Sequence, residues 1–126
     1  MKKIIQTSQA PKPVGPYSQA VQQGPFLFCS GQIAIDPSSD EVQRGTVESQ
    51  TQRVMKNIEA VLKEAGYDFS HVVKTTIYLT DMNDFAQVNS IYAQYFTSSP
   101  PARSTVAVSG LPKGVQVEIE VTAYRG

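Results

Sequence analysis

Apolar and polar residues alternate along VQVEIEVTAY, the segment at residues 115–124. Side chains of an extended strand point alternately to two faces, so this pattern predicts a strand with one apolar face. Glu118 and Glu120 share the opposite face. The apolar face is typical of packing on a core, whereas two glutamates side by side raise the question of what the second face does.

Two other segments repeat their apolar residues at steps of three and four, which is the spacing of an amphipathic helix. The first begins at Val47, with Thr46 as the expected N-cap and Gly66 as the C-terminal stop. The second follows Asp81, which can cap it, and a Pro-Pro pair ends that region. Its apolar side consists of Phe85, Val88, Tyr92, Tyr95 and Phe96.

Five further segments predict strands: KKIIQT, YSQAVQQ, FLFCSGQIAI, VVKTTIYLT and STVAVS. Gly24-Pro25 indicates a hairpin turn, and DPSSDE is expected to be a loop. The order predicts an α+β fold, a mixed six-stranded sheet with two helices packed on one face, in a single domain over residues 1–126. Because FLFCSGQIAI is almost continuously apolar, the sheet face without helices should be covered by another subunit.

Charge and composition narrow the function. The 126 residues include 11 basic and 11 acidic side chains, and this zero net charge offers no electrostatic footprint for nucleic acid or an anionic membrane. A single cysteine, Cys29, and a single histidine, His71, exclude an intrachain disulfide and a zinc-ligand pattern. As a nucleophile and base they lack an orienting third group. No segment is typical of a signal peptide or membrane span, so a cytoplasmic location is expected.

Arg103 follows two prolines at the start of the segment STVAVS. One hypothesis makes it a structural ion pair with Glu118 or Glu120. The other makes it a carboxylate anchor, because a planar guanidinium can hold both carboxylate oxygens through parallel hydrogen bonds. If Glu118 is partly buried, desolvation and its like-charged neighbour would raise its pKa, which suits a general acid/base. Glu120 is expected to face solvent.

Three other positions have a structural and a functional interpretation. A glycine within a strand, such as Gly31 after Ser30, marks either a bulge or a place where a ligand approaches the backbone. Tyr17, after Gly-Pro, is either a packed aromatic or a hydroxyl aimed into a site. Asn89 lies beside the apolar stripe of the second helix, where a satisfied interface amide is the structural interpretation.

Taken together, GPYSQA, SGQI, DMNDFAQVN and above all PARSTVAVSGLPKGVQVEIEV resemble the Rid family of reactive-intermediate deaminases, in its RidA branch. The resemblance runs essentially from end to end. It is most specific in the final block, through Arg103, Leu111 and the Val117-Glu118-Ile119 triplet. It implies a chorismate-mutase-like fold and a homotrimer with active sites in the clefts between subunits.

The resemblance also implies an activity: hydrolysis of enamine and imine acids, such as 2-aminoacrylate and 2-aminocrotonate, to 2-keto acids and ammonia, with no cofactor or metal. Arg103 would bind the substrate carboxylate, and Glu118 would handle the attacking water. The pocket would be lined by Tyr17, Ser30, Gly31, Asn89 and Thr105. Many relatives have a cysteine in place of Thr105, a difference that bears on pocket polarity and substrate preference.

Two other functions are compatible with the sequence. A non-catalytic sensor of small carboxylates would keep Arg103 and could dispense with proton transfer by Glu118. An RNA-acting translation inhibitor, a role attached to some relatives, has less support because the net charge is zero. An assay of 2-aminoacrylate decay separates the enzyme from both alternatives.

Overall fold

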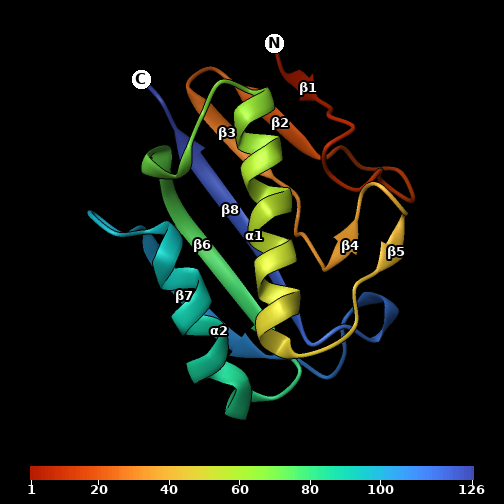
Figure 1. The fold of residues 1–126 in the computed structure, drawn as a ribbon. Coiled ribbons are helices and arrows are strands. Elements are labelled where there is room, and N and C mark those ends of the chain that lie inside the picture. The colour runs from red at the N-terminus through yellow and green to blue at the C-terminus, as the bar shows by residue number, and fades with distance from the viewer.

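Six strands form one mixed sheet, and two helices lie across one of its faces (Figure 1). The computed structural model describes all residues, 1–126. The strand order is β1-β2-β3-β8-β6-β7, in which β6 and β7 are parallel and all other neighbours antiparallel. The strands are β1 (Lys3–Ile5), β2 (Ala20–Gln23), β3 (Phe26–Cys29), β6 (Val72–Leu79), β7 (Ala102–Ala107) and β8 (Val117–Tyr124). The predicted α+β class is confirmed.

Helix α1 spans Val47–Glu64 and follows the predicted amphipathic pattern. Thr46 caps it, because the Thr46 hydroxyl oxygen accepts a hydrogen bond of 3.1 Å from the amide of Ser49. Gly66 lies two residues past the helix and adopts a φ of 82°, which glycine reaches without steric cost. Neither α1 nor any other helix is long and apolar enough to cross a membrane.

Helix α2 (Phe85–Tyr92) connects the parallel strands β6 and β7, which need such a crossover. Asp81 begins this region as predicted, since its carboxylate accepts a backbone hydrogen bond of 2.9 Å at the start of a 3₁₀ turn that leads into α2. The α-helix is shorter than the predicted apolar stripe, because residues 93–95 form another 3₁₀ turn. The Tyr92 hydroxyl ties α2 to the sheet by a buried hydrogen bond of 2.8 Å with the hydroxyl of Thr75.

The core lies between the sheet and the two helices. Strand β8 occupies the middle of the sheet, and its Val117, Ile119 and Val121 are almost completely buried against the helices. They belong to one cluster of buried side chains with Met55 and Ile58 of α1. The alternating pattern therefore identified the core face of this strand correctly.

The segment FLFCSGQIAI does not form one continuous strand, contrary to the prediction. Strand β3 ends at Cys29, and Gln32 then forms an isolated bridge with Ile119 of β8 through backbone hydrogen bonds of 2.9 and 3.2 Å. The chain keeps β8 as a neighbour through this break and loses β2. The amide of Ser30 still bonds the Gln19 carbonyl beside β2, at 2.9 Å, while Gln32 bonds only β8. The interruption therefore coincides with the Ser-Gly pair singled out in the sequence.

The segment DPSSDE is the tip of a small hairpin and not a plain loop. Strands β4 (Ile35–Asp36) and β5 (Glu41–Val42) pair as a separate two-stranded sheet. The carboxylate of Asp36 accepts hydrogen bonds from the Ser38 amide and hydroxyl, at 2.9 and 2.7 Å. Asp40 turns the chain with a φ of 62°. These local bonds explain why a segment rich in turn residues brings two short strands together.

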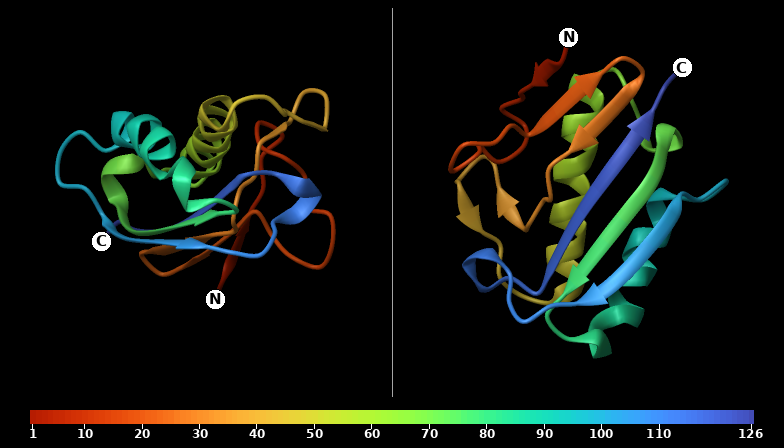
Figure 2. Two further views of the ribbon diagram at one scale, coloured as in Figure 1. Left: turned by 90° about the horizontal axis from the view of Figure 1, so that it is seen from below. Right: turned by 180° about the vertical axis from the view of Figure 1, so that it is seen from behind.

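Both helices cover the same face of the large sheet, and no element covers the opposite face (Figure 2). We call this opposite side the open face. It carries aromatic side chains at one corner, where Phe26 and Tyr124 meet edge to face with ring centroids 5.0 Å apart. Phe26 and Phe28 are 41% and 49% exposed, so they stay largely in contact with solvent in the single chain. The predicted apolar second face is therefore present.

Replacing Thr46 with alanine should destabilise the protein by about 1 kcal/mol, because an amide at the start of α1 loses its side-chain partner. Denaturant unfolding measures the change. Thr46→Ser keeps the hydroxyl and serves as the matched control, with stability close to that of the wild type. Equal stability of the alanine and serine variants would show that the cap contributes nothing.

Candidate active site

The residues expected at the site fall into two groups. Four of them line one cavity of about 450 Å³ beside the interruption after β3: Tyr17, Ser30, Gly31 and Glu118. The other three, Asn89, Arg103 and Thr105, lie on α2 and β7 and are absent from this cavity. A single chain therefore brings together only part of the predicted site.

Within the cavity, the backbone of Gly31 lies directly against the side chain of Glu118. A Cβ at this position would overlap the carboxylate of Glu118. The backbone of Gly31 has no left-handed φ, so the reason for glycine is space and not conformation. The sequence suggested either a bulge or a ligand approach here, and the structure shows the approach of a neighbouring carboxylate.

Glu118 is half-buried, and burial raises the pKa of its carboxyl above the ordinary value, with a smaller contribution from the charge of Glu120. Contrary to expectation, the side chain of Glu120 is not simply solvated. It is partly buried, and its carboxylate accepts a hydrogen bond of 3.2 Å from the hydroxyl of Tyr78 on β6. A raised pKa moves a carboxyl toward the range in which it can serve as a general acid or base.

The hydroxyl groups of Ser30 and Tyr17, both on the cavity wall, form hydrogen bonds with the backbone of the N-terminal loop. Ser30 donates from its Oγ to the Ser18 carbonyl at 2.6 Å. Tyr17 is 52% exposed, and its hydroxyl oxygen accepts a long hydrogen bond of 3.4 Å from the amide of Val14. Tyr17 therefore lies on the cavity wall with most of its ring free to contact a ligand or a second chain.

Gln19 is a residue that sequence reasoning missed. Its side chain is buried, and its Nε2 donates to the carbonyls of Thr7, Ala10 and Pro11 at 3.0, 3.2 and 2.9 Å. Its Oε1 accepts the amide of Thr7 at 2.7 Å. One amide group thus fixes the loop that delivers Tyr17. Its only sequence signal is a polar residue directly before a strand.

Arg103 forms no ion pair with Glu118 or Glu120, so the structural ion-pair hypothesis is wrong for the single chain. No lysine or arginine lies within 4.0 Å of a carboxylate; the one basic–acidic contact is between His71 and Asp68, at 3.4 Å. Arg103 instead donates from Nη1 to Oδ1 of Asn89 at 2.6 Å. Its guanidinium also lies over two aromatic rings of α2, 5.4 and 5.0 Å from their centroids. These contacts orient the guanidinium and leave it without a carboxylate partner.

Strand register shows why the two charged groups stay apart. Arg103 pairs with Thr75, whose side chain is buried toward α2, whereas Glu118 pairs with Tyr78 on the open face. The strands β7 and β8 flank β6, so their backbones are roughly 10 Å apart across the sheet. The two side chains also point to opposite faces. They cannot bind one small ligand within a single chain.

Thr105 shares the helix side of β7 with Arg103, two residues away. Its Oγ1 is buried and has no hydrogen-bond partner in the chain. A buried hydroxyl without a partner costs free energy, and in native proteins such a group usually has a functional or solvent-related reason. The hydroxyl is therefore available to a group that is not part of this chain.

Cys29 and His71 do not form a nucleophile–base pair. Burial raises the pKa of the Cys29 thiol to about 12, which suppresses the reactive thiolate. His71 belongs to a capping box, in which its Nδ1 accepts the amide of Asp68 at 2.9 Å. No group of three or more His, Cys, Asp and Glu side chains could hold a metal ion.

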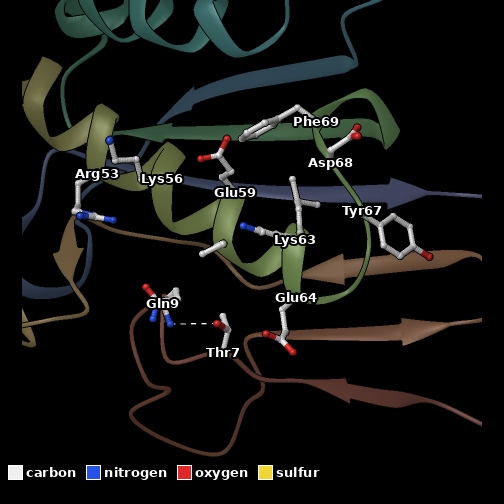
Figure 3. Close-up of a pocket in the computed structure, with 12 residues that line it drawn as sticks. Thr7, Gln9, Arg53, Lys56, Glu59, Lys63, Glu64, Tyr67, Asp68 and Phe69 are labelled. Atoms are coloured by element: carbon white, nitrogen blue, oxygen red, sulfur yellow. Dashed lines mark hydrogen bonds between the residues drawn. The ribbon is translucent and has the colours of Figure 1, made fainter.

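A second hollow, a groove of about 870 Å³, follows the outer side of α1 (Figure 3). Its charges are mixed, with Arg53, Lys56 and Lys63 beside Glu59 and Glu64. None of the residues that line it was predicted at the site. With opposite charges interleaved along the helix surface, the groove is typical of a solvated helix face.

Known proteins resemble this chain closely in sequence and in structure. The family model described as Endoribonuclease L-PSP matches residues 7–125. The chain belongs to this family, which includes the Rid proteins. YyfA from Yersinia pestis, a protein of unknown function of the conserved Rid protein family, has a solved structure that is 50% identical in sequence. The two superpose with a TM-score of 0.96, over 99% of this chain and 100% of YyfA.

Two further Rid relatives have more informative names. The human 2-iminobutanoate/2-iminopropanoate deaminase is 48% identical over 126 residues, which cover 100% of this chain and 92% of the human protein. TdcF from E. coli, solved with bound serine, is 40% identical with a TM-score of 0.94, over 98% of this chain and 99% of TdcF. The resemblance seen in the motifs is therefore confirmed as membership of the Rid family.

The Glu118→Gln variant should be more stable than the wild type at neutral pH. Because burial raises the pKa of Glu118, the folded state binds this proton more tightly than the unfolded chain does. The resulting stability is complete below 4.5, the ordinary glutamate pKa, and is lost as pH rises through the raised value. Thermal unfolding should give the variant a higher Tm than the wild type at about pH 8 and an equal Tm at about pH 4.

The control for this measurement is Glu41→Gln, which changes an exposed glutamate on the β4–β5 hairpin. It should follow the wild type at both pH values. A Glu118→Gln variant that melts below the wild type at about pH 8 would show that the ionised carboxylate supports the fold.

Proposed function

We propose that this protein hydrolyses enamine and imine acids, such as 2-aminoacrylate and 2-aminocrotonate, to 2-keto acids and ammonia. The observation that carries the proposal is Glu118, a half-buried carboxyl of raised pKa on the wall of a cavity. A carboxyl whose pKa lies above the ordinary value is better suited to give and accept a proton during catalysis. The name of the human relative, at 48% identity, and the serine bound to TdcF support the same substrate class.

Each active site would combine Glu118 of one subunit with Arg103 of its neighbour in a homotrimer. The two residues face opposite sides of the sheet, which supports a site in which a second copy of the chain supplies the other half. Apolar side chains on the open face, such as Phe28 and Val106, give copies of the chain a surface to bury. Closed assembly of this kind is usual for soluble homo-oligomers.

The substrate supplies its own electrophile, the imine carbon. The Arg103 guanidinium would hold the substrate carboxylate through two parallel hydrogen bonds. Glu118 would accept a proton from water as the water oxygen bonds to the imine carbon and the C=N bond becomes single. The carboxyl would then return that proton to nitrogen. In the resulting carbinolamine, Glu118 would then take the hydroxyl proton and pass it to nitrogen, so that the C–N bond breaks, ammonia leaves and the oxygen remains as the new carbonyl.

The remaining site residues would position these groups. Asn89 would keep the guanidinium oriented through its 2.6 Å hydrogen bond with Arg103. Gly31 would keep the Glu118 carboxylate against the backbone, where a side chain would displace it. Tyr17 and Ser30 would contribute hydroxyls on the cavity wall. The unpartnered hydroxyl of Thr105, beside Arg103, would meet the substrate or a bound water.

The description of the family model names a second activity, endoribonuclease. Freshly generated 2-aminoacrylate and a labelled single-stranded RNA, each incubated with the purified protein, distinguish the two functions. We expect faster decay of 2-aminoacrylate, with keto acid and ammonia as products, and intact RNA. Cleaved RNA with unchanged imine decay would overturn the proposal, and binding of keto acid without any acceleration would indicate a sensor.

Arg103→Lys should fold normally and lose at least about tenfold in kcat/KM, equivalent to roughly 1.4 kcal/mol. Lysine keeps the charge and loses the planar fork that fixes a carboxylate. The loss should be smaller for imines that lack a carboxylate. Arg125→Lys is the matched control, because Arg125 bonds the carbonyl of Gly66 away from the cavity. Equal losses on both substrate types, with a lower Tm, would assign Arg103 to the fold.

Mixing two inactive variants tests the shared site directly. In a cyclic oligomer assembled from equal amounts of Arg103→Ala and Glu118→Gln subunits, about one site in four receives the intact Arg103 and the intact Glu118. Co-refolding should therefore restore about a quarter of the wild-type activity. Each variant refolded alone is the control. Mixed oligomers, identified by mass, that recover no activity would show that both residues act within one chain.

A further inference from the structure

Two lysines line the cavity that contains Glu118. Lys12 comes from the loop that Gln19 anchors, and Lys113 comes from the turn before β8. Neither has a carboxylate within ion-pair distance, since the one basic–acidic contact in the chain is between His71 and Asp68. Two exposed lysines without an ion-pair partner therefore belong to the lining of the cavity.

The position of Lys113 is fixed by its backbone. Its φ is 58°, a left-handed conformation that is uncommon for residues other than glycine. The Lys113 carbonyl accepts a hydrogen bond of 2.9 Å from Nη2 of Arg44, which reaches over from the chain after β5. A strained residue persists only where its surroundings hold it, and such positions are frequent at binding sites.

In the single chain the cavity is larger than a minimal substrate. Its volume of about 450 Å³, before a neighbouring subunit adds its part of the wall, lies in the range of sites for ligands larger than an acid of three or four carbons. Its wall mixes apolar side chains, among them Val14, Ile33 and Pro112, with the two lysines. An aliphatic chain that ends in an anionic group matches both parts of this wall.

We propose that Lys12 and Lys113 form a second anion subsite, and that the protein prefers imino acids with an anionic group on the side chain. The inference rests on the proposed function, in which Arg103 of the neighbouring subunit holds the first carboxylate. The substrate then spans the cavity from Arg103 to the lysines, with its imine carbon beside Glu118. Imines of dicarboxylic amino acids have this arrangement of charges.

Isosteric substrate pairs give the sharpest test. An amino-acid oxidase generates the imines of aspartate and asparagine, and of glutamate and glutamine, in the presence of the protein. The members of each pair differ in charge and hardly in size. We expect kcat/KM to be about tenfold higher for the acidic member, and to fall toward the neutral value as salt rises from about 0.02 M to about 0.5 M.

Variants assign the preference to the lysines. Lys113→Gln and Lys12→Gln should each reduce the acidic-to-neutral ratio by about threefold, which lies within the usual contribution of an exposed ion pair. Lys113→Arg should keep the ratio high because it keeps the charge. The matched control is Lys56→Gln, an exposed lysine in the groove along α1, which should leave both rates unchanged.

The outcomes separate the inference from the function on which it rests. Hydrolysis of neutral and acidic imines at equal efficiency, or a ratio unaffected by both lysine variants, would overturn the subsite and leave the deaminase intact. Failure to accelerate any of the four imines would overturn the proposed function itself. Tm values of the lysine variants equal to that of the wild type exclude unfolding as the cause of a lost preference.

Discussion

Strand β8 has to serve two faces of the sheet at once, because its side chains point alternately to opposite sides. Val117, Ile119 and Val121 are buried in the core beneath the helices. Because side chains alternate along the strand, Glu118 and Glu120 lie on the open face. The chain after β3 stays beside β8, and because Gly31 has no side chain the Glu118 carboxylate lies directly against its backbone. One alternating pattern thus creates both the core and the cavity.

The same alternation of side chains places Arg103 out of reach of Glu118 within one chain. Strand β7 pairs in parallel with β6, and this register turns Arg103 toward α2, where Asn89 and two aromatic rings hold it. A guanidinium so oriented and a half-buried carboxyl are suited to one small acid, yet the sheet separates them. Burying the open face against another copy solves two problems together. It covers exposed aromatic surface, and it can bring an arginine to a glutamate.

Sequence patterns predicted the elements whose local signals agree with the fold. The Thr46 cap, the steps of three and four in α1 and the alternation in β8 each reflect a periodicity that tertiary packing does not override. The break after Cys29 was missed, because the strand pairing that remains there, between Gln32 and Ile119 of β8, joins residues distant in sequence. The anchoring role of Gln19 and the cavity position of Lys113 were invisible for the same reason.

The features that weaken this fold gather around the cavity and the sheet edge near Arg103. Burial opposes the ionisation of Glu118, the Thr105 hydroxyl lacks a hydrogen-bond partner, and Lys113 adopts a left-handed backbone conformation. Between the helices and β8, by contrast, propensity, pattern and packing agree. Each exception is tolerated because the adjacent rigid sheet holds it in place, and each leaves a polar group ready for a ligand. In the proposed assembly, a site divided between two copies would need no flexible lid, since assembly itself would close the cavity around groups that one chain leaves unsatisfied.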